Sequence, residues 1–156
     1  RAARPAQNGQ EVVGWHRESF YGTPPEAINF WMPVQGVTGE NTLRYIPDSD
    51  AIADEDIVTV SEPDDDVEQY SAGHRIGLLY APKRIVSGVD LSKAESLIVP
   101  EGCAALFPGA LIHGNAQNDA DEIRFSIDFR LIAKQHMREA KEHFASGQEY
   151  FVPLAA

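Results

Sequence analysis

The chain has 156 residues, a length that suits one domain with a sizeable hydrophobic core. It carries 13 basic and 24 acidic side chains, so its formal net charge is −11. Such a charge repels a nucleic-acid duplex and an anionic membrane, which leaves a small diffusible molecule as the expected partner. No pattern in the chain indicates an oligomeric state.

The single cysteine of the chain excludes an internal disulfide framework, so the cytoplasm is the expected compartment. No run of residues is long and apolar enough to cross a bilayer, and no signal peptide is visible. Cys103 lies among small and apolar residues, and we expect it to be a small core residue of a strand rather than a nucleophile.

The pattern of apolar residues predicts a series of short strands. Residues 1–10 are small and polar and are expected to form a flexible lead-in. After them, alternation and a content of β-branched and aromatic residues predict strands at residues 11–15, 27–37, 42–46, 57–60, 77–81, 83–89 and 124–130. Turn-forming residues separate these strands, so most of the chain is expected to be β-structure.

The pattern changes to a helical one after residue 132. Met137, Ala140, Lys141 and Phe144 fall on one stripe at the helical period, and Gly147 follows as a C-terminal cap. A run of strands without intervening helices favours a β-sandwich or jelly roll over an α/β sheet. We therefore expect one β domain over residues 11–132, with a helix and tail over residues 133–156 that pack on it.

One stretch, residues 102–130, contains most of the polar groups that point to chemistry. The chain turns over Pro108 and Gly109, reaches His113 at the end of a short apolar run, and crosses a polar loop to Arg124. The strand that begins there alternates polar and apolar residues, so Arg124, Ser126 and Asp128 share one face. A histidine that ends one strand and an arginine that opens its hairpin partner are therefore expected in one pocket.

A second cluster supports a metal site. His16 and Glu18 are two residues apart directly after an apolar run, and extended backbone places both side chains on the same face. Together with His113 they make up two histidines and one carboxylate, the facial triad that leaves one side of a non-haem Fe(II) open. The tripeptide alone is a weak signal, but the Arg124-x-Ser126 pair eleven residues after His113 makes the pattern much more specific.

The order H-x-E, then H, then R-x-S resembles the pattern of Fe(II)/2-oxoglutarate-dependent oxygenases, and it is most similar to their phytanoyl-CoA dioxygenase-like branch. Three parts of the chain fit this branch: the segment with Trp31 after the first motif, residues 43–50, and a final block. The final block consists of Gly102, Phe107, His113, Gly114, Asn118 and Arg124. The residues around His16 are also similar to proteins of streptomycin biosynthesis. The chain departs from most of the family in having Glu18 where Asp is usual.

The resemblance implies a double-stranded β-helix, the cupin-like jelly-roll barrel, and an enzyme that hydroxylates a small molecule while it converts 2-oxoglutarate and O₂ to succinate and CO₂. By motif match His16, Glu18 and His113 would be the catalytic iron ligands. Arg124 would hold the distal carboxylate of 2-oxoglutarate with help from Ser126, because a guanidinium donates two parallel hydrogen bonds to a carboxylate. Trp31 and Asn115 match positions that line the cosubstrate pocket.

Three alternatives remain at this point. The chain could be a cupin-like sugar-binding or isomerase module, although cupins usually have H-x-H where this chain has H-x-E. It could also be a degenerate oxygenase fold without catalysis, which the complete triad argues against. Finally, Asp128 could pair with Arg124 for structural reasons alone, since a buried arginine requires a partner.

Overall fold

The structure is a computed structural model that describes residues 2–3, 5, 14–21, 23–24, 26–60, 84–115 and 118–136. These residues form short antiparallel strands joined by loops and single turns of 3₁₀ helix. The expected class, mainly β with a jelly-roll arrangement, is confirmed. The C-terminal helix expected at 137–147 and the strand expected at 77–81 lie outside the described residues.

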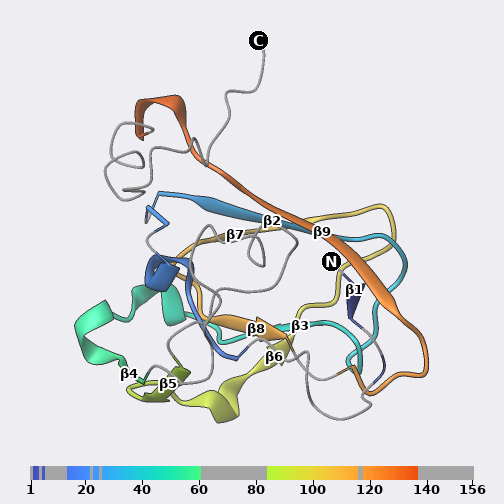
Figure 1. The fold of residues 1–156 in the computed structure, drawn as a ribbon, viewed down its shortest axis with the longest axis horizontal. Coiled ribbons are helices and arrows are strands. Elements are labelled where there is room, and N and C mark those ends of the chain that lie inside the picture. Colours follow the sequence, from blue (N-terminus) through green and yellow to red (C-terminus); the bar gives the residue numbers. More distant parts are fainter. Residues whose placement is uncertain are drawn as a thin grey trace, which may run out of the picture.

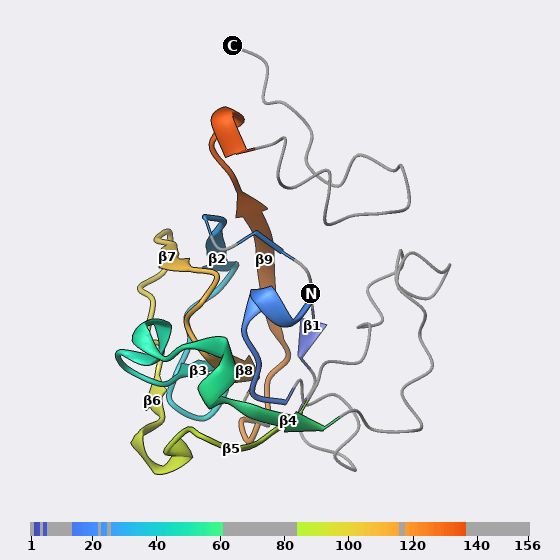
Figure 2. The ribbon, with the colours of Figure 1, turned by 90° about the vertical axis from the view of Figure 1, so that its left-hand side faces the viewer.

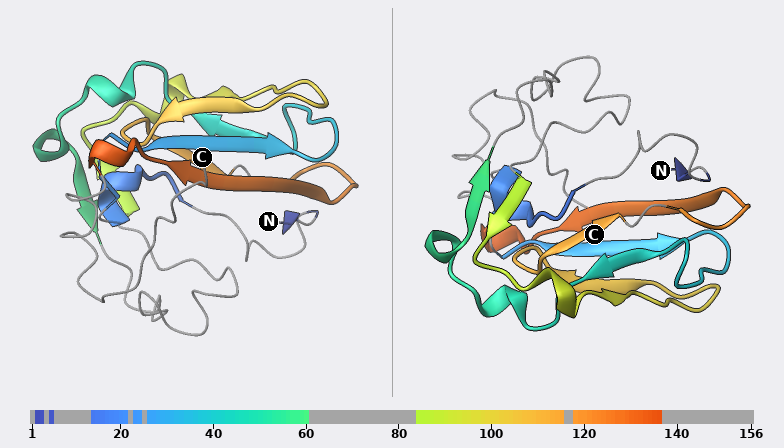
Figure 3. Two further views of the ribbon diagram at one scale, coloured as in Figure 1. Left: turned by 90° about the horizontal axis from the view of Figure 1, so that it is seen from above. Right: turned by 90° about the horizontal axis from the view of Figure 1, so that it is seen from below.

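The larger sheet has four antiparallel strands in the order β1-β9-β2-β7. They are β1 (Ala2–Ala3), β9 (Arg124–Leu131), β2 (Ile28–Pro33) and β7 (Ala105–Pro108). Seen from above, β9, β2 and β7 lie side by side (Figure 3). Strands far apart in the sequence are therefore neighbours in this sheet, as the crossing connections of a jelly roll require.

A second layer faces this sheet. It contains β6 (Glu95–Ser96), β3 (Leu43–Tyr45) and β8 (His113–Asn115), in that order. A separate hairpin-like pair, β4 (Val58–Val60) and β5 (Arg84–Ser87), lies at the outer end of this layer (Figures 1 and 2). The two layers enclose an interior whose walls are β2 and β9 on one side and β3 and β8 on the other.

The described residues contain five short 3₁₀ helices: η1 (Glu18–Tyr21), η2 (Ser49–Ala51), η3 (Asp54–Asp56), η4 (Leu91–Lys93) and, after the last strand, η5 (Lys134–His136). After β5 the chain turns at Gly88, which has φ of 89°. A Cβ there would lie 2.0 Å from the Asp56 carbonyl oxygen, so the close approach of this turn to η3 requires glycine.

Alternation along β9 separates a polar interior from an apolar exterior. Arg124 and Ser126 are buried, whereas Phe125 and Ile127 are each 47% exposed on the outer face of the sheet. Phe30 of β2 stacks on Phe129 on that outer face, with ring centroids 4.3 Å apart. The expected shared face of Arg124 and Ser126 is therefore the inner one.

Two apolar clusters support the interior. The first contains Ile46, Ile57, Ile85 and Ile112, and Trp15 and Phe20 pack against it. The second contains Trp31, Leu43 and Val99, with Phe107 among the partly buried residues that cover it. The first cluster lies under the segments that carry His16 and His113, and the second lies between β2 and β3. Both clusters therefore support the walls that hold the polar interior.

Residues 2–3, within the segment expected to be a lead-in, form β1 and pair with Phe125 and Arg124 at the edge of the sheet. One expectation is wrong. Cys103 is not a core residue of a strand: it is exposed, because it ends the turn at Glu101 and Gly102 and lies before the start of β7 at Ala105. The predicted strands at 27–37 and 42–46 are confirmed with shorter bounds, because Pro33 ends β2 and a turn precedes β3.

Among the described residues, no helix is long and apolar enough to span a membrane.

Truncation of Ile112 will destabilise the protein strongly. Its side chain is completely buried in the first apolar cluster, so Ile112→Ala leaves a cavity and is expected to lower the free energy of unfolding by about 2–5 kcal/mol. Urea denaturation followed by circular dichroism measures this loss. Ile98→Ala is the matched control, because Ile98 is 55% exposed and its truncation should change stability little. Equal losses in the two variants would contradict this description of the core.

Candidate metal centre

Two histidines far apart in the sequence are joined by their backbones. The amide of His16 donates to the carbonyl of His113, and the amide of His113 donates back to the carbonyl of His16, both at 2.9 Å. This reciprocal pair places the two rings together, with centroids 4.4 Å apart. Each side chain is 6% exposed, so the rings face the interior rather than solvent.

Each histidine ring is oriented by the same local contact. Nδ1 of His16 lies 2.8 Å from the carbonyl oxygen of Gly14, and Nδ1 of His113 lies 2.9 Å from that of Leu111. A carbonyl oxygen can only accept, so Nδ1 carries the proton and donates it in both rings. The lone pair of each Nε2 is then directed into the site, which is the arrangement found in histidine metal ligands.

Glu18 is the first residue of η1, and its side chain is buried next to His113. Its backbone amide donates to the carbonyl of Gly109 at 2.9 Å, which fixes the start of η1 against the turn that precedes β8. A Cβ at Gly109 would lie 3.4 Å from the Cβ of Glu18 and 3.2 Å from the carbonyl oxygen of Ala27. The small residue in this turn therefore allows the carboxylate ligand to approach the barrel wall.

Arg130 holds the Glu18 carboxylate in a two-point contact that the sequence reasoning did not identify. Nε of Arg130 donates to Oε2 at 3.0 Å and Nη2 donates to Oε1 at 2.6 Å. The sequence does contain an indication of this position, because alternation along β9 places Arg130 on the same face as Arg124. A bidentate guanidinium fixes both the position and the rotation of a carboxylate.

Burial and charge fix the protonation states of two of the three residues. Burial, and secondly the nearby His113, lower the pKa of His16 to about 3, so its imidazole is neutral. Burial alone would raise the pKa of the Glu18 carboxyl, but the neighbouring His113 and the Arg130 guanidinium outweigh burial and lower this pKa below its usual range. Glu18 is therefore an anion and His16 a neutral donor near pH 7, as metal ligation requires.

These three residues fit a divalent cation. One nitrogen or oxygen atom from each lies within 4.8 Å of the others, and all three side chains are buried. Nε2 of His113 is 3.6 Å from Oε1 of Glu18, so a nitrogen donor and a carboxylate oxygen face each other across a short gap. A cation between them would contact both atoms. Two imidazoles and one carboxylate suit a first-row metal such as Fe(II) and leave coordination positions open.

Arg17, between the first two ligands, ties their segment to the rest of the fold. It is 2% exposed, and its guanidinium donates to the carbonyls of Ser49 at 2.6 Å and Ile52 at 2.9 Å and pairs with Asp54. The hydroxyl of Ser49 accepts a hydrogen bond from the amide of Ile112 at 2.8 Å. One turn therefore holds both the segment before Glu18 and the residue before His113.

The residues expected to bind the cosubstrate lie on the inner face of the larger sheet. Arg124 is 1% exposed, its Nη1 donates to the carbonyl of Asn41 at 2.6 Å, and its guanidinium carbon is 5.6 Å from the ring centroid of Trp31. Ser126 is buried two residues along β9, opposite Pro33. The structure therefore brings Arg124 and Trp31 into contact and places Ser126 beside them.

The remaining expectations have different outcomes. Asn115 ends β8 opposite Leu43, but its side chain lies outside the description. Asp128 was the alternative partner expected for Arg124, and its Oδ1 lies 3.7 Å from Nη1 of Arg130.

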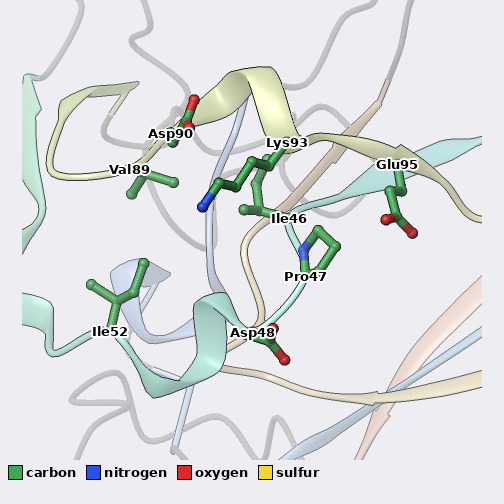
Figure 4. A pocket seen from close by; sticks show the side chains of 8 residues that line it. All are labelled: Ile46, Pro47, Asp48, Ile52, Val89, Asp90, Lys93 and Glu95. Carbon is green, nitrogen blue, oxygen red and sulfur yellow. The ribbon is translucent and has the colours of Figure 1, made fainter.

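A surface pocket of about 490 Å³ lies elsewhere in the molecule (Figure 4). It is lined by Ile46, Pro47, Asp48, Ile52, Val89, Asp90, Lys93 and Glu95. None of the residues that form the metal centre lines it. The pocket therefore has no direct connection to the candidate chemistry.

The metal-free protein will lose stability as the pH falls from 7 to 5. Folded His16 stays neutral in this range because its pKa is about 3, whereas the unfolded chain takes up a proton near the ordinary value of 6.5. The unfolded state therefore binds more protons, and the free energy of unfolding falls by at most about 1.4 kcal/mol per pH unit. Urea unfolding of chelator-treated protein measures the slope. His16→Gln, which does not titrate, should flatten it, and equal slopes would refute this origin.

Loss of Arg130 will weaken metal binding. Arg130→Leu removes the contact that orients Glu18 and leaves a buried carboxylate without its cation, so the affinity for Co(II) should fall by about 10- to 100-fold. Isothermal titration calorimetry measures this affinity. Arg44→Leu is the matched control, since Arg44 donates to the Ala94 carbonyl on the opposite wall. Unchanged or tighter binding in Arg130→Leu would mean that Arg130 competes with the metal for Glu18.

Comparison with solved structures identifies relatives of this fold. EvdO2 from Micromonospora carbonacea var. aurantiaca is 18% identical with a TM-score of 0.57, and the match covers 84% of this chain and 49% of EvdO2. A structure of EvdO2 complexed with 2-oxoglutarate is 17% identical, with a TM-score of 0.55 and coverage of 85% and 51%. The non-heme monooxygenase ThoJ is 22% identical, with a TM-score of 0.51 and coverage of 82% and 42%.

This chain thus spans about half the length of these proteins, or less, and at these identities the likeness shows a shared fold. No curated protein sequence matches the chain. A family model does: the model of phytanoyl-CoA dioxygenase (PhyH) matches residues 2–126, which include His16, Glu18, His113 and Arg124. With most of its length matched, the chain belongs to the phytanoyl-CoA dioxygenase (PhyH) family.

Proposed function

We propose that this chain is the catalytic core of a non-haem Fe(II)/2-oxoglutarate-dependent dioxygenase that hydroxylates a small molecule. The observation that carries the proposal is the buried triad of His16, Glu18 and His113, with donor atoms within 4.8 Å of one another. The match to the PhyH family supports the same chemistry.

The state of the three ligands supports Fe(II) as the metal. His16 and His113 each present Nε2 because Nδ1 is engaged by a carbonyl, and Glu18 is held as an anion by Arg130. Two imidazoles and one carboxylate on one side of an octahedral ion leave the other side for cosubstrate and O₂. When bound, Fe(II) supplies the redox chemistry that couples substrate oxidation to decarboxylation of 2-oxoglutarate.

Arg124 supports 2-oxoglutarate as the cosubstrate. A buried guanidinium suits an anion, because the planar arrangement of its N–H groups matches a carboxylate. Trp31 packs over this guanidinium and restricts its rotation. The structure of EvdO2 complexed with 2-oxoglutarate shows that this fold can hold the molecule.

The proposed reaction balances without another redox partner. Substrate C–H, O₂ and 2-oxoglutarate give substrate C–OH, succinate and CO₂; one oxygen atom enters the alcohol and the other enters succinate. The chain's part is to hold the ligands and the distal carboxylate in one buried site, where water competes less for the charged groups. The single cysteine supports a cytoplasmic location.

An anaerobic titration tests the proposal. Addition of Fe(II) and then 2-oxoglutarate should produce the weak visible charge-transfer band of the chelate. His113→Ala should abolish the band because it removes a ligand, and Arg124→Met should raise the 2-oxoglutarate concentration needed for half-saturation by roughly 10-fold or more. Arg44→Met is the control for loss of an arginine from the opposite wall. No band in the folded wild-type protein would overturn the proposed function.

A further inference from the structure

The side-chain amide of Asn29 in β2 is buried and has no hydrogen-bond acceptor in the part of the chain that the structure describes. Asn29 is 5% exposed, and its Nδ2 has no partner among the described residues. A buried amide without a partner costs about 1–3 kcal/mol. Native structures rarely retain such a group unless it has a use, so a bound molecule is the expected source of the missing acceptor.

The position of Asn29 directs this amide towards the metal centre. Alternation along β2 places it on the buried inner face with Trp31. Its cross-strand partners are Phe107 on β7 and Arg130 on β9. Directly paired side chains on one face of a sheet lie in contact range, so Asn29 lies between these two residues.

Both of these neighbours touch a proposed metal ligand. Phe107 packs edge-on against the ring of His113, with centroids 5.0 Å apart, and Arg130 binds Glu18 through two hydrogen bonds. The amide of Asn29 is therefore flanked by the residues that support the histidine and the carboxylate of the triad.

The same strand leads from the metal centre to the expected carboxylate clamp. Trp31, two residues after Asn29, contacts Arg124. Neighbouring residues on one face of a strand are about 7 Å apart, so Trp31 and Asn29 mark successive positions along a path from the guanidinium to the triad. A molecule whose distal carboxylate binds Arg124 and whose other end reaches the metal therefore passes Trp31 first and ends beside Asn29.

We infer that the Asn29 amide donates a hydrogen bond to the oxo-acid end of 2-oxoglutarate, the end that reaches the metal. This inference rests on the proposed function and adds a second protein contact to that of Arg124. A carboxylate or keto oxygen satisfies the buried N–H, and the contact fixes how the oxo acid rotates at the metal.

Pyruvate separates this contact from the one made by Arg124. It has the same oxo-acid end as 2-oxoglutarate but no distal carboxylate. Anaerobic Fe(II)-loaded protein is titrated with each oxo acid, and the charge-transfer band gives the dissociation constant. Asn29→Leu, which has nearly the same shape but no N–H, should weaken both oxo acids by the same factor, roughly 10-fold. Arg124→Met should weaken 2-oxoglutarate alone.

Two further measurements distinguish loss of the proposed contact from a general disturbance of the fold or of the metal ligands. The affinity of Asn29→Leu for Co(II) without oxo acid and its urea midpoint should equal those of the wild type or exceed them, since a buried unpartnered amide has been removed. If the leucine side chain disturbs the packing, Asn29→Ala serves as a second variant that also lacks the N–H group.

The possible failures are distinguishable. If the wild type forms the band and the Asn29 variants bind both oxo acids as tightly as it does, this inference is wrong and the proposed function stands. Weakening of 2-oxoglutarate but not of pyruvate would also overturn it, because the contact would then be to the distal end. A wild type without a band would overturn both.

Discussion

The backbone bridge between His16 and His113 is the contact on which the proposed site depends. Two reciprocal hydrogen bonds join segments from opposite ends of the domain, and the rings that they bring together are the two nitrogen donors of the triad. Because the bridge is made by main-chain atoms, it does not depend on which metal is present. The same backbone geometry turns each Nδ1 towards a nearby carbonyl, so ligand position and ligand tautomer have one structural origin.

This arrangement buries several charged groups, and the fold gives Arg17 and Glu18 specific partners. Arg17 is surrounded by the carbonyls of Ser49 and Ile52 and the carboxylate of Asp54, and Ser49 in turn holds the strand that leads to His113. Glu18 has Arg130. A buried charge is tolerated only when such partners are fixed, because removal of one leaves the other uncompensated. The network around the metal centre therefore stabilises the fold and aligns the ligands at once.

Charge is distributed along the interior in a way that suits the proposed chemistry. Arg124 and Arg130 lie at the two ends of β9, the first next to Trp31 and the second on Glu18. With a divalent metal near Glu18, an anion with two carboxylates can be neutralised at both of its ends. Arg124 thus places a buried cation in the interior of a chain whose net charge is −11.

The sequence by itself determined the β class, the three metal-ligand candidates and the inward face of Arg124, because these follow from residue type and from a strand period that is local. It could not supply Arg130, whose role depends on a partner 112 residues away, nor the unpartnered amide of Asn29, whose significance appears only when burial and register are known. It also misplaced Cys103, since the ends of strands and the positions of turns are decided by what packs beside them. Tertiary structure decided which side chains meet, because that depends on strand order and register rather than on spacing along the chain.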